Sequence, residues 1–151
     1  MARRMSDPEA RLDELINRVR ERNYRLTPQR LAILKIVAAS EGHPSAERIF
    51  DQIKTEFPTT SLATVYKTIA MLKDMNQVLE LDFGSGGNRY DGNRPYSHAH
   101  LVCLECGDIV DAELDVLDTL PQQIATRTGY QLVSHRFDIY GICSRCRSQR
   151  A

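Results

Sequence analysis

The spacing of apolar residues predicts a helical first part of the chain and a mixed second part. Up to about residue 75, apolar residues recur every three or four positions, which is typical of helices that bury one face. From Leu79 to Phe83 they alternate with Glu80 and Asp82, which is typical of a half-buried strand. The helical period therefore gives way to a strand period near residue 79.

Four helices are predicted before this change, because a residue that can cap a helix precedes each apolar run. The predicted starts are Ser6, as a capping box with Glu9 and with Pro8 in the first turn, then Thr27 with Pro28, Ser45, and Ser61. Gly42-His43-Pro44 interrupts the second helix, and the fourth covers about 62–75. The side chains predicted to face inward are Leu12, Leu15, Ile16, Val19, Leu31, Leu34, Val37, Ile49, Phe50, Ile53, Leu62, Val65, Ile69 and Leu72.

A hairpin is predicted after the fourth helix. Gly84-Ser85-Gly86-Gly87 has the composition of a turn, and Asn88–Asp91 follows it as a returning strand. Four helices followed by a hairpin is the order of elements in a winged helix-turn-helix domain. A generic small helical domain is equally consistent with the pattern.

The rest of the chain is predicted to form a second domain of mixed α/β structure. Strands are expected at 100–103, 109–113 and 131–140, with a helix through Leu117, Leu120 and Ile124. The expected fold class is therefore α+β. The predicted domain boundaries are a first, helical domain with a hairpin at 1–91, a linker at 92–95, and a second, α/β domain at 96–151.

Charge and hydropathy narrow the class of protein only slightly. The 151 residues carry 20 basic and 20 acidic side chains, which gives no chain-wide attraction to nucleic acid. Residues 1–35 hold a local basic excess of four (9 − 5). No apolar run reaches the roughly 20 residues that span a bilayer, and the first residues lack the apolar stretch of a signal peptide. We therefore expect a cytoplasmic protein, in which structural disulfides are rare.

All four cysteines lie in two Cys-x-x-Cys pairs, Cys103 with Cys106 and Cys143 with Cys146. Each pair is expected in a tight turn beside a glycine, which would direct two thiolates at one ion. Two such turns complete a tetrahedral structural zinc site. The alternatives are a redox dithiol, which usually opens a helix after a strand and occurs once, and four unrelated thiols.

A second possible ligand set combines imidazoles and carboxylates. His98 and His100 are expected on one face of a strand, and Asp91 and Asp111 lie near them in the sequence. His43 comes from the helical first part, so an ion shared by all five residues would join the two parts. Such a set suits Fe(II), Mn(II) or Zn(II). The alternative is that His43 is a turn residue and the aspartates are solvated.

Five motifs, spanning about 20–146, resemble the ferric uptake regulator (Fur) family. They are Arg25-Leu-Thr-Pro-Gln-Arg30, His43-Pro-Ser-Ala-Glu47, Ser61-Leu-Ala-Thr-Val-Tyr66, His98-x-His100-x-x-Cys103-x-x-Cys106-Gly107, and Tyr140-Gly-x-Cys143-x-x-Cys146. The resemblance implies a metal-dependent transcriptional repressor rather than an enzyme. It also implies structural zinc at the four cysteines and regulatory iron or manganese at His43, Asp91, His98, His100 and Asp111.

The resemblance also implies that 1–91 is a winged-helix DNA-binding domain and that 96–151 is a dimerisation and zinc-binding domain, and it places the DNA contacts. The helix from Ser61 to Lys73 matches the recognition helix, and Tyr66 matches the family tyrosine that touches DNA. Because one winged helix contacts few phosphates, we expect a homodimer on a palindromic operator. The candidate DNA-binding residues are Arg25, Ser61, Thr64, Tyr66 and Lys67, with Arg22 as a further candidate.

Two positions favour the peroxide-sensing, PerR-like branch of the family. Family members that regulate iron uptake usually carry Glu where this chain has Asp91, whereas the peroxide branch usually carries Asp there and at Asp111. The resemblance then implies that His43 and His98 are oxidation-sensitive. The alternative is an iron-responsive repressor of iron-uptake genes. The extra metal site of many such repressors is expected to be absent. Two of its positions are occupied by Ser97, a poor ligand, and Ala99, which is no ligand, so Asp118 and His135 lack partner ligands.

The sequence motifs do not support the interpretation that the protein is an enzyme. A His/Asp metal site could activate water, but the chain has no nucleophile motif, no Gly-rich phosphate loop and no general base outside the ligands. A metal-storage module is the remaining alternative, and it would not need a helix-turn-helix.

Overall fold

The computed structural model describes residues 6–83 and 87–150, which fall into two compact units, 6–96 and 97–150. The amino-terminal residues 1–5 and most of the predicted glycine-rich turn, 84–86, lie outside the described residues. Each unit is described below by itself. None of the described helices is both long and apolar enough to cross a membrane.

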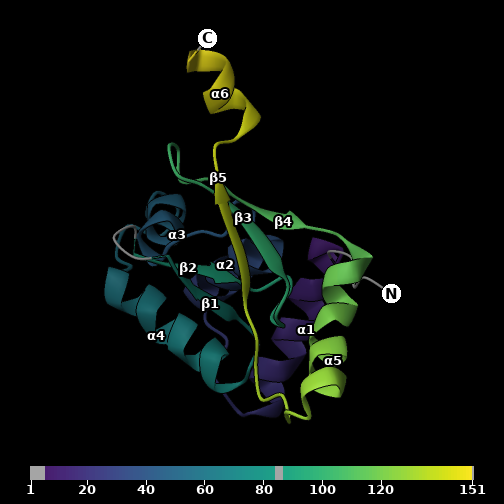
Figure 1. Cartoon of the computed structure of the whole chain (residues 1–151). Coiled ribbons are helices and arrows are strands. Elements are labelled where there is room, and N and C mark those ends of the chain that lie inside the picture. Colours follow the sequence, from purple (N-terminus) through teal and green to yellow (C-terminus); the bar gives the residue numbers. More distant parts are fainter. Residues whose placement is uncertain (1–5, 84–86, 151) are drawn as a thin grey trace. The chain divides into compact units, whose positions relative to one another are not determined.

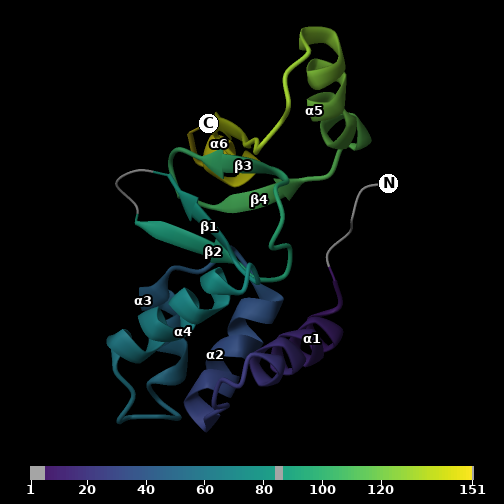
Figure 2. The ribbon, with the colours of Figure 1, turned by 90° about the horizontal axis from the view of Figure 1, so that it is seen from below.

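The first unit consists of helices followed by a hairpin, as the sequence predicts (Figures 1 and 2). Strands β1 and β2 pair antiparallel, with Leu79 opposite Asp91 and Asp82 opposite Asn88. This hairpin is the wing of a winged helix-turn-helix. The elements of the unit are α1 (Pro8–Glu21), α2 (Pro28–Ala39), α3 (Ala46–Ile53), α4 (Leu62–Asp74), β1 (Leu79–Asp82) and β2 (Asn88–Asp91).

Three of the four predicted helix starts are confirmed. Thr27, Ser45 and Ser61 each accept a hydrogen bond from the backbone N–H three residues later. The prediction for α1 is wrong, because Asp7 rather than Ser6 is the N-cap. Pro8 occupies the first helical turn, so Asp7 precedes the helix and its carboxylate accepts from the N–H of Ala10 at 3.1 Å.

The apolar core of the first unit forms between the four helices and the wing. Most predicted inward positions are buried, but Leu31 is only half-buried and Ile33 takes its place on the buried face of α2. Phe83 lies beyond the end of β1. Leu12, Ile16, Phe50 and Leu62 are half-buried at the edge of this core. The fully buried members include Leu15, Val19, Ile33, Leu34, Val37, Ile49, Val65 and Leu72.

Residues that follow the wing are buried in the same unit. A Cβ on Gly92 would lie 2.1 Å from a methyl carbon of Val37, so only glycine fits there. The Ser40 hydroxyl accepts from the N–H of Gly92 at 2.7 Å, and Arg11 Nε donates to the Gly92 carbonyl at 2.6 Å. The backbone directly after Asp91 is therefore fixed to α1 and α2.

The second unit is built on a three-stranded sheet in the order β4-β3-β5. Strand β3 pairs antiparallel with β4 and parallel with β5, which lies beside it in Figure 1. The elements are β3 (Ala99–Cys103), β4 (Ile109–Ala112), α5 (Asp115–Thr128), β5 (Phe137–Gly141) and α6 (Ser144–Arg150). The α+β fold class is confirmed.

The end of the chain departs from the prediction in two ways. The last strand covers only Phe137–Gly141, because 131–136 form no strand and are exposed. The sequence analysis also missed α6. Its seven residues include only one apolar side chain, Cys146, so no hydrophobic period marks this helix.

Candidate metal centres and DNA-binding surface

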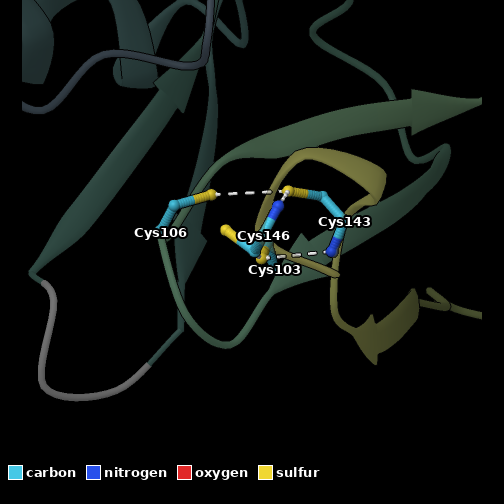
Figure 3. Close-up of side chains that lie close together, drawn as sticks. All are labelled: Cys103, Cys106, Cys143 and Cys146. Carbon is cyan, nitrogen blue, oxygen red and sulfur yellow. Dashed lines mark hydrogen bonds between the residues drawn. The ribbon is translucent and has the colours of Figure 1, made fainter. Parts of the chain in front are cut away.

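The four cysteines come together within the second unit (Figure 3). Cys103 ends β3, Cys106 lies in the following turn, and Cys143 and Cys146 lie at the start of α6. The Sγ atoms of Cys103 and Cys146 are 3.9 Å apart, and those of Cys106 and Cys143 are 3.8 Å apart. These separations match the edge of a tetrahedron, about 3.8 Å, around a zinc ion with Zn–S bonds of about 2.3 Å.

Charge also favours a cation at this site. Backbone N–H groups of Cys106 and Cys143 hold the pKa of Cys103 down to about 6, whereas the neighbouring Cys143 side chain raises the pKa of Cys146 to about 12. Four thiolates this close repel one another, so a divalent ion is needed before all four can ionise. The donors and their spacing fit structural zinc.

One detail of the predicted zinc site is wrong. The first pair does lie in a tight turn, which Gly107 completes at a φ of +72°. The second pair instead spans the first turn of α6, where the N–H of Cys146 donates to Cys143 Sγ at 3.5 Å. A helix after a strand is the setting expected of a redox dithiol. Convergence of both pairs on one centre nevertheless distinguishes this site from a lone dithiol.

Two imidazoles and a carboxylate meet on one face of the second unit's sheet. The rings of His98 and His100 are buried, with their centroids 4.3 Å apart. Asp111 Oδ1 lies 3.1 Å from His98 Nε2 and 3.8 Å from His100 Nε2. The sheet pairing explains this proximity, because His100 is opposite Asp111 in the β3–β4 register.

Asp138 on β5 is a neighbour of His100, outside the cluster of candidate ligands, that the sequence analysis missed. Its Oδ1 lies 3.5 Å from His100 Nδ1, and its Oδ2 accepts from Arg136 Nε at 2.7 Å. The visible signal is an acidic residue inside an otherwise apolar strand. Its link to His100 depends on the pairing of β3 with β5, which places His100 opposite Asp138.

The remaining two predicted ligands lie together in the first unit. His43 is buried and adopts a φ of +47°, and its Nδ1 lies 3.7 Å from Asp91 Oδ2. The other carboxylate oxygen of Asp91 accepts from the N–H groups of Asn93 at 3.0 Å and Arg94 at 2.9 Å. Asp91 is therefore held by one oxygen while the second faces the imidazole. Asp91, which is 1% exposed, is therefore not the solvated group of the alternative interpretation.

The candidate DNA-binding residues lie at the surface of the first unit. Tyr66 on α4 is 45% exposed, although its neighbour Val65 is fully buried. Its hydroxyl donates to Glu47 Oε1 at 2.7 Å, which lowers the pKa of Glu47 and raises that of Tyr66. Ser61, Lys67 and Arg25 are exposed, and Thr64 is half-buried. Glu47 is a contact that sequence analysis did not anticipate.

Residues matching the extra site of iron-uptake regulators do not assemble into a ligand cluster within the part of the chain that is described. Ser97 donates its hydroxyl to the His135 carbonyl at 2.8 Å, and the side chains of His135 and Asp118 are exposed. None of the three belongs to a metal-ligating group among the described residues.

The fold and these clusters define a winged-helix protein with a metal-binding α/β domain. The family model of the ferric uptake regulators matches residues 21–140, and the chain belongs to this family of metal-dependent, DNA-binding transcriptional repressors. The chain is 36% identical to the peroxide-responsive repressor PerR of Staphylococcus saprophyticus over 149 residues, which cover 99% of this chain and 100% of that protein.

Two solved structures support the fold. The ferric uptake regulator of Helicobacter pylori superposes with a TM-score of 0.79 at 23% identity, covering 96% of this chain and 97% of the other. PerR from Streptococcus pyogenes superposes with a TM-score of 0.51 at 33% identity, covering 95% of each chain.

Proposed function

We propose that this chain is a homodimeric repressor of peroxide-stress genes that releases its operator when hydrogen peroxide oxidises metal-ligating histidines. The observation that carries this proposal is its 36% identity, over nearly its full length, to a peroxide-responsive repressor. Aspartate rather than glutamate at position 91, together with aspartate at position 111, points the same way. We place the protein in the cytoplasm, where operator DNA is accessible.

The proposed regulatory ligands are His43, Asp91, His98, His100 and Asp111. Within each unit, the candidate ligand atoms face one another at 3.1–3.8 Å. Imidazole and carboxylate donors suit Fe(II) or Mn(II). Because the ligands come from both units, binding an ion would favour one arrangement of the units over others, which is how a ligand shifts a conformational equilibrium.

The proposed DNA contacts come from α4 with its N-cap Ser61, and from Arg25, which precedes α2. Tyr66 and Lys67 would face the major groove, while Arg25, Ser61 and Thr64 would contact the backbone nearby. Two-fold symmetry would then require a palindromic operator.

The second unit exposes large apolar side chains that a second copy of the chain would cover. Tyr130 is 75% exposed and Val133 is 96% exposed, in the segment between α5 and β5. Val116 and Ile124 on α5 are also exposed. Several large apolar side chains exposed in one small unit are typical of an interface. We therefore assign dimerisation to this unit.

Bound Fe(II) would supply the redox chemistry that activates hydrogen peroxide. The net change in the protein is addition of one oxygen atom to a ligand imidazole, His43 or His98. The ring loses two electrons, peroxide gains them, and the second peroxide oxygen leaves as water. The burial of both rings limits access by other reactants. An oxidised ring is a poorer ligand, so the ion would no longer favour the DNA-binding arrangement and DNA would be released.

The test of this proposal begins by selecting the operator from random DNA. The Mn(II)-loaded protein is used to select duplexes from a random-sequence pool, and the selected DNA then serves as a probe in gel retardation. We expect a palindromic site that both Mn(II) and Fe(II) forms bind, and that only the Fe(II) form releases after a brief peroxide dose. Iron-dependent binding that ignores peroxide would instead identify an iron-responsive repressor.

A further inference from the structure

We propose that Asp138 is a positioning residue that fixes the ring orientation and the tautomer of His100. Asp138 would hold the proton on Nδ1, which leaves Nε2 as the nitrogen that binds metal. This inference rests on the proposed regulatory site for its consequence, although the effect on the His100 ring can be measured without that metal.

The sheet places His100 between two carboxylates. His100 on the central strand β3 is opposite Asp111 on β4 and opposite Asp138 on β5. Its Nε2 lies 3.8 Å from Asp111 Oδ1, and its Nδ1 lies 3.5 Å from Asp138 Oδ1. The two ring nitrogens therefore face different acceptors, and Asp111 shares its side with His98 Nε2.

Asp138 is itself held in place. Arg136 Nε donates to Oδ2 at 2.7 Å, so the carboxylate presents Oδ1 to the imidazole. The side chain of Asp138 is 13% exposed and that of His100 is 1% exposed. A carboxylate in such a setting is stabilised by a neighbouring N–H, and a neutral imidazole has only one to offer.

The consequence for ligand binding follows from the two tautomers of neutral histidine. With the proton on Nδ1, the lone pair of Nε2 points toward the side occupied by Asp111 and His98. With the proton on Nε2, that nitrogen has no lone pair available to bind a metal ion. A carboxylate behind a ligand histidine commonly improves metal affinity by about 10–100-fold for this reason. Asp138 is not in the ligand cluster itself, so its effect would pass through His100.

The test compares Asp138→Ala, which removes the acceptor, with Asp138→Asn, which keeps a weaker neutral one. Asp115→Asn, at an exposed aspartate of the same unit, is the matched control. Affinity for Mn(II) is measured by electron paramagnetic resonance on the zinc-loaded full chain. Nitrogen-15 spectra without Mn(II) report the tautomer of His100, whose signals are assigned with a His100→Gln variant.

We expect wild type to carry the proton on Nδ1, Asp138→Ala to lose this preference, and Mn(II) affinity to fall about 10–100-fold. Asp138→Asn should lie between the two, while zinc content and the Asp115→Asn variant stay unchanged. If Asp138→Ala does not yield zinc-loaded protein, Asp138→Asn carries the same comparison.

Two results would overturn the inference. One is an unchanged His100 tautomer in both Asp138 variants, and the other is Mn(II) affinity within twofold of wild type despite a changed tautomer. If the His43→Ala variant binds Mn(II) as tightly as wild type does, the proposed regulatory site has failed instead. The nitrogen-15 spectra would then still decide whether Asp138 orients His100.

Discussion

The two ligand sets of this chain are distributed in different ways. All four cysteines belong to the second unit, where their sulfur atoms already lie at the spacing of a tetrahedral zinc site. The histidine and aspartate candidates are divided, with His43 and Asp91 in the first unit and His98, His100 and Asp111 in the second. A site contained in one unit can only stabilise that unit. A set divided between two units can make their arrangement depend on the ion.

The two units also differ in how much apolar core each one contains. The first unit has an apolar core to which all four helices contribute. The second buries few apolar side chains, among them Val102 and Ile109, and exposes Tyr130 and Val133. The first unit can therefore be stable through its own side chains, whereas the second depends on zinc and, in our proposal, on a second copy.

The largest effect is expected from Cys143→Ser. Structural zinc in such sites contributes roughly 10–16 kcal/mol of apparent binding energy, and a domain of this size has about 5–15 kcal/mol of net stability. Loss of one thiolate should yield a monomeric or aggregating protein without zinc, while Ser144→Ala stays normal. Zinc analysis and size-exclusion chromatography measure both properties. A dimeric, zinc-loaded Cys143→Ser variant would show that the cysteines do not form the structural site.

The next effect separates the two ligand sets. His43→Ala should abolish activation of DNA binding by Mn(II), because it removes a ligand contributed by the first unit, yet it should leave zinc bound at the four cysteines. Gel retardation across a Mn(II) titration and zinc analysis provide the two readouts, with Glu41→Ala as a control at a neighbouring exposed residue. Activation equal to wild type would return His43 to the role of a turn residue.

These predictions use residues that the sequence itself could identify. The cysteine pairs and the cap residues Thr27, Ser45 and Ser61 are local signals, so spacing along the chain was enough to find them. The cap of α1 was mistaken because both Ser6 and Asp7 can cap a helix, and the position of Pro8 decides between them.

The remaining errors concern strand pairing, which the spacing of residues along the chain does not determine. Apolar residues at 131–136 resemble a strand, but they have no pairing partner in the described sheet and are exposed. The contact between His100 and Asp138 needs the register of two strands whose paired residues are 38 positions apart (138 − 100). The five motifs pointed to the family, whereas this supporting carboxylate required the three-dimensional structure.

A smaller effect is expected within the first unit from Tyr66. Tyr66→Ala should weaken operator binding by about 1–3 kcal/mol, the usual range for one base-contacting side chain, while metal content and thermal stability stay near wild type. Tyr66→Phe separates the ring from the hydroxyl that donates to Glu47. Fluorescence anisotropy with the selected operator gives the affinities. Unfolding of Tyr66→Ala would mean that the side chain supports the fold.

The smallest expected change concerns the peroxide response alone. Asp91→Glu lengthens the side chain by one methylene, which displaces a carboxylate now fixed by the N–H groups of Asn93 and Arg94. The variant should still bind the operator when loaded with Mn(II), but the Fe(II) form should release DNA more slowly after peroxide. Release at the wild-type rate would show that the length of the side chain at position 91 does not set the sensitivity to peroxide.

The most direct test of the account is a peptide map of the Fe(II)-loaded protein after a brief peroxide dose. We predict one added oxygen atom on His43 or His98, in step with the loss of operator binding, and no addition in the Mn(II)-loaded form. The four cysteines should remain reduced and zinc-bound over the same period. Unmodified histidines, with DNA release that follows cysteine oxidation or does not occur, would contradict the proposed sensing mechanism.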